Sequence, residues 1–198
     1  NAIDLLSEDF EDEGRYKSIR NPVAITWLTS FEQIRRQCRL ATDYLCSMAC
    51  VKEKDILISL FPPAPIVEQQ KAIGILSSYS FVRMRHEDSR LDMHRLVQPA
   101  TRNWLQSVGS LREWQLHVLH CLAARFPLVD LLNRSQWRAA VPHALQILSL
   151  TASENQLPAW LHLLQSVASC HITDGRYREA EKLYSEALEI SETLYGPE

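Results

Sequence analysis

The fold of this chain is decided by the stretch Gly175-Arg-Tyr177-Arg-Glu-Ala180-Glu-Lys-Leu183-Tyr184-Ser-Glu-Ala187-Leu188-Glu-Ile190. Small residues occur at Ala180 and Ala187, and bulky apolar residues occur around them at helical spacing. This pattern is typical of a helix against which a second helix packs closely along one side. The apolar face of such a helix therefore needs a second helix to cover it. Because the sequence does not start with Met, we expect a piece of a longer protein.

Length and composition are those of an ordinary globular chain. The 198 residues are 46% hydrophobic and carry a formal net charge of -3, which gives no basic excess for an obligatory nucleic-acid or anionic-membrane partner. The sequence has no run of about 18 apolar residues that could span a bilayer and begins without the features of a signal peptide. The five cysteines are odd in number and lie within apolar helical patterns, which favours a reducing compartment. We therefore expect a cytoplasmic protein.

The apolar periodicity predicts a mainly α chain with one small β-hairpin. Helices are expected to begin at Pro22 and near Leu40, and a short third helix should run from Lys54 to Phe61, where a run of prolines forbids its continuation. The alternation within residues 79–84 and 91–93 predicts the hairpin. Further helices are expected over residues 66–78, from His94 to Leu105, and over 111–126, 137–150, 160–173 and 177–194, with Pro142 as a kink or an early break.

The expected order of elements, which is several helices, a hairpin and another helix, is that of a winged-helix domain. The first function to consider for such a domain is DNA binding. The hairpin carries Arg83, Arg85 and Arg90, but residues 53–70 contain no cluster of base-reading side chains. We therefore expect no nucleic-acid partner and keep a DNA-binding regulator only as a third alternative.

Four short motifs, taken in order, resemble a known family. They are Thr29-Ser-Phe-Glu-Gln-Ile-Arg-Arg36, Phe61-Pro-Pro-Ala64, Tyr79-Ser-Phe81 and Asp92-Met-His-Arg-Leu-Val97. Together they look like the winged-helix end of fungal NB-ARC proteins, which are signal-transduction NTPases of the Nod-like receptor type with C-terminal tetratricopeptide repeats. The stretch from Ala168 to Glu198 likewise resembles one tetratricopeptide repeat of the kinesin-light-chain kind.

The resemblance covers essentially the whole chain and implies four segments. Residues 1–21 would be the tail of a preceding helical subdomain with a connector, 22–106 the winged-helix domain, 110–152 a helical linker, and 157–198 a tetratricopeptide α-hairpin that is the first of a truncated array. Asn21-Pro22 and the residues around Gly109 are the expected hinges.

The resemblance also implies a nucleotide-sensing role for His94. In the family, a Met-His-Asp motif points its His at the β-phosphate of bound ADP in the inactive state, and the matching residues here are Met93, His94 and Arg95. Free backbone N–H groups at a helix start favour an anion, and an imidazole adds a directed donor. Arg95 departs from the acidic residue of the family motif, which leaves the detailed geometry open. The alternative is that His94 is only a residue at the start of a helix.

The chain itself lacks the machinery that holds nucleotide phosphates. It contains no Gly-x-x-x-x-Gly-Lys-Ser/Thr sequence and no strand pattern ending in paired carboxylates. We therefore expect no enzymatic activity from this segment. ADP or ATP would be bound only in the full-length protein, through an upstream nucleotide-binding domain in cis.

Two clusters of potentially reactive side chains are better explained as packed helix residues than as a metal site or a catalytic set. His117, His120 and Cys121 share a helix face, but a zinc site usually needs four ligands and no second cluster lies nearby in the sequence. Cys170, His171 and Asp174 are neighbours at a helix end with nothing to orient them as a nucleophile and its base. We expect neither a metal site nor a catalytic set.

In the family that the chain resembles, repeat arrays bind peptides in a groove lined by the first helix of each pair. By that resemblance His162, Gln165 and Ser169 are candidate contacts for a protein or peptide ligand, unless they are merely solvated. The leading hypothesis is a regulatory and scaffolding segment of a signal-transduction NTPase. The alternative is a plain interaction module with a structural winged-helix cap and no nucleotide role.

Overall fold

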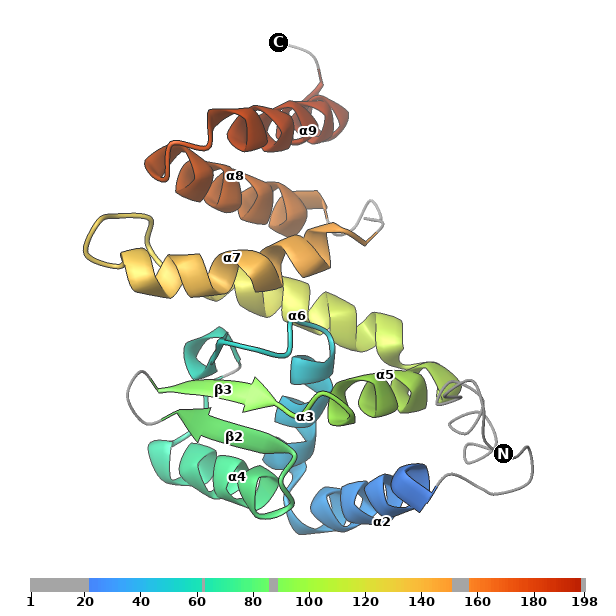
Figure 1. Cartoon of the computed structure of the whole chain (residues 1–198). Helices are drawn as coiled ribbons and strands as arrows, with labels where there is room; N and C mark the ends of the chain where they lie inside the picture. Colours follow the sequence, from blue (N-terminus) through green and yellow to red (C-terminus); the bar gives the residue numbers. More distant parts are fainter. Residues whose placement is uncertain (1–21, 62, 86–88, 151–156, 197–198) are drawn as a thin grey trace, which may run out of the picture.

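The computed structural model describes residues 22–61, 63–85, 89–150 and 157–196. In this part the chain is mainly helical with a small antiparallel sheet, and the last helices stack beyond the sheet and its surrounding helices (Figure 1). We call residues 22–107 the N-terminal unit and residues 157–195 the C-terminal hairpin. The tail and connector predicted at residues 1–21 lie outside the described residues.

Two packed helices begin the N-terminal unit. Helices α2 (Pro22–Gln37) and α3 (Arg39–Ala49) are separated by Cys38, whose backbone is extended. The buried rings of Trp27 and Phe31 stack with their centroids 5.0 Å apart, and Phe31 also contacts Trp104 at 4.5 Å. The predicted pair of helices is confirmed.

The sheet has three strands in the order β1-β3-β2. They are β1 (Ile56–Leu57), β2 (Val82–Arg85) and β3 (Arg90–Met93), and both pairings are antiparallel. A 3₁₀ turn, η1 (Ile58–Leu60), and helix α4 (Ile66–Ser78) connect β1 to β2. The predicted hairpin is confirmed as β2 and β3, but the sheet also contains β1.

The short third helix predicted from Lys54 to Phe61 is present only as the 3₁₀ turn over Ile58–Leu60, and the prediction is wrong for the residues before it. Asp55 has a left-handed backbone (φ 60°), which a helix does not allow. Its N–H donates to the carboxylate of Asp92 on β3 at 3.0 Å. The buried Ile56 and Leu57 then pair with β3. Pairing with a distant strand therefore overrides the local helical pattern.

Helices α5 (Val97–Ser107) and α6 (Leu111–Arg125) follow the sheet. Helix α5 begins at Val97 and not at His94, whose N–H donates to the carbonyl of Phe81 at 2.9 Å. Between the two helices Gly109 has φ 71°, a conformation that glycine adopts without strain.

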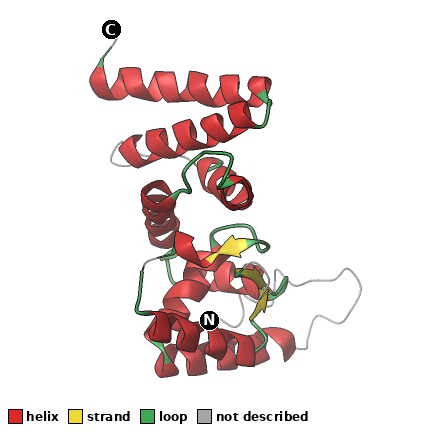
Figure 2. Ribbon diagram, turned by 90° about the vertical axis from the view of Figure 1, so that its left-hand side faces the viewer, coloured by secondary structure: helices red, strands yellow, loops and turns green. Residues whose placement is uncertain are grey.

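Three more helices complete the described chain: α7 (Arg134–Leu148), α8 (Leu157–Thr173) and α9 (Tyr177–Tyr195). Helix α7 continues through Pro142, whose ring provides no N–H for the carbonyl of Arg138. Helices α8 and α9 form an antiparallel pair, as predicted (Figure 2). The turn between them has Gly175 at φ 73° and a hydrogen bond from the Arg176 N–H to the His171 carbonyl, which is how many helices end.

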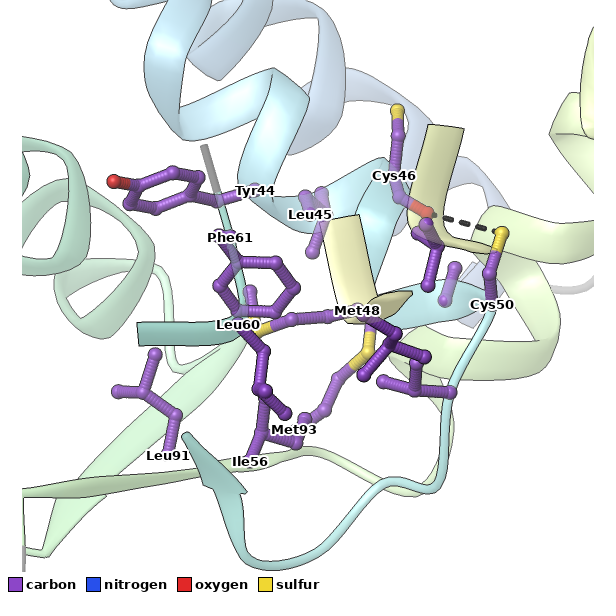
Figure 3. Close-up of a cluster of buried hydrophobic side chains, with 14 of the residues drawn as sticks. Tyr44, Leu45, Cys46, Met48, Cys50, Ile56, Leu60, Phe61, Leu91 and Met93 are labelled. Atoms are coloured by element: carbon purple, nitrogen blue, oxygen red, sulfur yellow. Dashed lines mark hydrogen bonds between the residues drawn. The ribbon is translucent and has the colours of Figure 1, made fainter. Parts of the chain in front are cut away.

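Helix α3 and the sheet enclose a cluster of buried side chains (Figure 3). Its members include Tyr44, Leu45, Met48, Ile56, Leu60, Phe61, Leu91 and Met93. Cys46 and Cys50 are buried beside it, and the Cys50 thiol donates to the Cys46 carbonyl at 3.5 Å. Burial raises the pKa of both thiols to about 12. They are packed core side chains.

The same core continues through α6 and α7 to residues of α8 and α9, including Trp160 and Ala187. None of the described helices is long and apolar enough to cross a bilayer.

Candidate functional site

His94 is an exposed residue in the turn between β3 and α5. Its Nδ1 atom accepts a hydrogen bond from the N–H of Leu96 at 3.2 Å. When Nδ1 of a neutral imidazole is an acceptor, the proton lies on Nε2. Because the backbone of His94 is also bonded to Phe81, the turn holds an imidazole with an N–H donor at Nε2.

The backbone around His94 differs from the prediction. We expected free N–H groups at the helix start, but the N–H groups of Val97 and Gln98 both donate to the His94 carbonyl, at 2.9 and 3.3 Å. Pro99 has no N–H. His94 therefore caps the start of α5 itself, and any contact with an anion would rest on its Nε2 atom and on the neighbouring exposed Arg95.

A second polar cluster joins the sheet to α7 around Asp55. The Asp55 carboxylate accepts hydrogen bonds from Arg85 and from Arg90, and the bond to Arg85 is the main reason that its pKa is lowered. Arg90 also donates to the carbonyl of Ser135 at 3.1 Å. On the backbone side, Nε2 of the buried His143 lies 3.2 Å from the Asp55 carbonyl. Asp55 thus connects β2, β3 and α7.

This cluster lines an open groove of about 500 Å³ between the N-terminal unit and α7. Its walls are residues 52–55, Arg90 and one face of α7 from Ser135 to Pro142. Two of the three hairpin arginines that raised the DNA-binding alternative are thus engaged with Asp55.

A third cluster joins α7 to the C-terminal hairpin. Arg134 and Arg138 donate to the carboxylate of Asp174, with nitrogen-to-oxygen distances of 2.9 and 2.8 Å at their closest. The Asp174 side chain is 9% exposed, whereas the two arginines are about half exposed. The hydrogen bond to Arg138, followed by the one to Arg134, lowers the pKa of Asp174.

The candidate partner contacts on α8 differ in accessibility. His162 and Gln165 are exposed, but Ser169 is half-buried. The Ser169 hydroxyl donates to the Gln165 carbonyl at 2.9 Å and lies 3.1 Å from the hydroxyl of Tyr184 on α9. Ser169 therefore takes part in the contact between the two helices, and His162 and Gln165 are the more accessible pair.

In the sets considered for chemistry, Cys121, Cys170 and His171 are buried, whereas His117 and His120 are exposed and not packed as predicted. Cys121 Sγ lies 3.6 Å from His117 Nε2, but the described residues contain no group of three or more side chains placed to hold a metal ion. Cys170 is buried, its pKa is raised to about 12 mainly by burial, and a thiol of that kind is a poor nucleophile. Asp174 is engaged by arginines of α7.

Sequence reasoning missed the Asp55 and Asp174 clusters. Both connect residues that are far apart in the chain, by 88 positions for Asp55 and His143. The one local signal was the group of arginines on the predicted hairpin, which we considered only as DNA contacts.

Comparisons with known proteins bear on the chain as a whole. No protein-family model matches it, and no solved structure matches it. Over 195 residues, or 98% of its length, the chain is 38% identical to a "Nucleotide-binding leucine-rich repeat (NLR)-like protein" of Hyaloscypha variabilis. It spans 20% of the length of that relative. Nearly the whole chain is thus similar to one segment of an NLR-like protein.

Proposed function

We propose that this chain is a regulatory and scaffolding segment of a signal-transduction NTPase of the NLR type. The N-terminal unit would be a winged helix that senses bound ADP or ATP in cis, and the C-terminal hairpin would begin a tetratricopeptide array that binds a protein ligand. The similarity to an NLR-like protein supports the class of protein. The order of helices, small sheet, linking helices and antiparallel hairpin supports the division of roles.

The observation that carries the sensing role is the state of the His94 imidazole. Its Nδ1 atom is occupied by the Leu96 N–H, so the ring orientation is fixed and Nε2 carries the proton of the neutral form. An exposed, oriented N–H donor beside Arg95 suits a phosphate oxygen presented by an upstream domain. The nucleotide itself would be held by that domain.

The polar clusters on α7 support a route from the sensor to the hairpin. Met93, next to His94, ends β3, and β3 begins at Arg90, which contacts Ser135 and Asp55. Helix α7 then reaches the C-terminal hairpin through Asp174. A displacement of the sheet would therefore be passed to the hairpin through packed and hydrogen-bonded groups.

The sensing role is tested in a protein extended upstream through the nucleotide-binding domain. We expect His94→Ala to release a fluorescent ADP analogue on the order of tenfold faster than wild type, because one hydrogen bond to a charged phosphate is lost. His94→Asn is the sharper variant. Its short amide keeps an acceptor near the Leu96 N–H but does not extend to the position of Nε2, so release should be fast while the turn stays intact.

His120→Ala, which changes an exposed histidine on α6, is the control and should release the analogue at the wild-type rate. If both His94 variants release the ADP analogue at the wild-type rate, the sensing role is wrong. The alternative of a plain interaction module with a structural winged-helix cap is then favoured.

The role of the hairpin in an array is supported by the outer face of α9. Tyr184, Leu188 and Tyr195 recur at helical spacing and are 38, 60 and 75% exposed. An apolar stripe of this kind suits the packing of a following helical pair. His162 and Gln165 on α8 are then the accessible contacts for the protein ligand.

A further inference from the structure

The loop between α6 and α7 displays three leucines. Leu128, Leu131 and Leu132 are 73, 73 and 95% exposed. The loop around them is well anchored, because the Asn133 N–H donates to the Asp130 carboxylate at 2.7 Å and the buried Trp137 donates from Nε1 to the Asp130 carbonyl at 2.8 Å. Side chains of this size at such exposure in an ordered loop are unusual unless they are covered by a partner.

The leucine loop adjoins the ionic cluster of α7 and the hairpin. Arg134 follows Leu132 closely in the chain and is bonded to Asp174 in the α8–α9 turn. On either side of Asp174, Ile172 and Tyr177 are 45 and 69% exposed. Figure 1 shows the α6–α7 loop and the α8–α9 turn on the same edge of the molecule. Apolar side chains therefore flank the two arginines on both sides.

The groove beside β1 continues this edge and adds basic side chains. Ser135 and Arg138 line the groove together with the exposed Lys52 and Lys54. The edge as a whole carries the basic residues Lys52, Lys54, Arg85, Arg90, Arg134, Arg138 and Arg176 against the acidic residues Glu53, Asp55, Asp92, Asp130 and Asp174, with Lys54 paired to Asp92 at 3.7 Å. It is thus locally basic on a chain whose formal net charge is -3.

We propose that this surface, which we call the leucine–arginine edge, docks a protein segment that carries acidic side chains among leucine-sized apolar ones. The leucines and Tyr177 require apolar cover, and the basic excess attracts carboxylates and orients the segment. A nucleic acid would use the cations but leave the leucines uncovered. The edge is separate from His94 and from the exposed pair on α8, so the inference goes beyond the proposed function and does not depend on it.

The test uses the whole chain and two fluorescein-labelled peptides of about 16 residues, which is long enough for an amphipathic helix. One is built from Leu-Leu-Glu-Glu repeats and the other from Leu-Leu-Lys-Lys repeats. By fluorescence anisotropy, the acidic peptide should bind at least about tenfold more tightly than the basic one, and added salt should weaken it.

Two double variants locate the site. Leu131→Ser with Leu132→Ser, and Lys52→Glu with Lys54→Glu, should each weaken the acidic peptide by about tenfold or more. All four positions are exposed, so both proteins should keep the wild-type circular dichroism. The matched control is Val67→Ser with Lys71→Glu on α4, which should bind as wild type. Three results would each overturn the proposal. The two peptides could bind equally tightly, either edge variant could bind the acidic peptide as tightly as wild type does, or the control variant could weaken binding as much as the edge variants do.

Discussion

His143 lies in the packing of α7 against β1, and its side chain is 1% exposed. As a neutral imidazole it donates from Nε2 to the Asp55 carbonyl, and among the described residues Nδ1 has no partner. Burial lowers the pKa of His143. The Asp55 hydrogen bond and the charges of Asp55 and Glu53 oppose that shift, and Lys52 adds to it. A second proton would leave an N–H group buried without an acceptor. Protonation of His143 therefore opposes the contact between α7 and β1.

We expect mild acid to destabilise the fold through His143. Because its folded-state pKa is depressed, the unfolded chain binds the proton first, so stability is lost as the pH falls from about 6.5 to the folded pKa. His143→Gln keeps a donor but cannot titrate. Between about pH 7.5 and about pH 5.5 its free energy of unfolding should fall less than that of wild type. Urea titrations measure this, with the exposed His162→Gln as control. Equal slopes for wild type and His143→Gln would contradict the assignment.

A short motif can single out one residue in the sequence, and the motif over residues 92–97 singled out His94 as a candidate. Asp55 and His143 could not be found, because nothing local distinguishes them from a surface aspartate and an ordinary helical histidine. Their roles arise from a contact between residues 88 positions apart. The sequence also did not predict that His94 caps the start of α5, because this role depends on where β3 ends.

At the scale of elements, the helices were predictable and the edge strand β1 was not. The helices bury residues that recur at helical spacing, such as Phe31 and Ile34 in α2. Strand β1 is two residues long, and its extended state depends on pairing with β3. A two-residue strand has no periodicity of its own, so its existence follows from the tertiary fold alone.

Two glycines in the helical elements should respond oppositely to alanine. Gly74 lies within α4, and Gly175 follows α8 with φ +73°; a Cβ at either position meets no atom within 4 Å. Gly74→Ala should raise the free energy of unfolding by about 0.5–1 kcal/mol, because alanine loses less backbone entropy. Gly175→Ala should lower it by about 1–2 kcal/mol, which is the cost of a left-handed backbone for an L-residue. Urea unfolding of both variants measures the pair, and a stabilised Gly175→Ala would refute the backbone argument.

At the scale of the whole molecule, α7 connects two halves that the sequence suggested as separate segments. Its Ser135 and His143 contact Arg90 and Asp55 of the N-terminal unit, while Arg134 and Arg138 contact Asp174 of the hairpin. The buried core also continues from Trp27 to Ala187. Because the halves share both a core and polar contacts, we expect wild type to unfold in one transition.

Removing the charge of Asp174 should weaken the connection to the hairpin. The lowered pKa of Asp174 means that its contribution is present above the ordinary carboxyl pKa of 3.8 and is lost as the pH falls through the folded value. At neutral pH, Asp174→Asn should therefore melt a few degrees below wild type, and high salt should reduce the difference because both arginines are about half exposed. Amide hydrogen exchange should accelerate in α8 and α9 more than in α3.

Glu32→Gln is the matched control, since it removes a pair between the half-buried Glu32 and the exposed Arg35 that lies within α2 and joins no two elements. It should leave exchange in the hairpin unchanged. If amide hydrogen exchange in α8 and α9 is as slow in Asp174→Asn as in Glu32→Gln, the ionic cluster does not couple the two halves. The hairpin would then be held by the apolar contacts of Trp160, Leu163 and Leu164 alone, and a signal from the sheet would have to travel through the core.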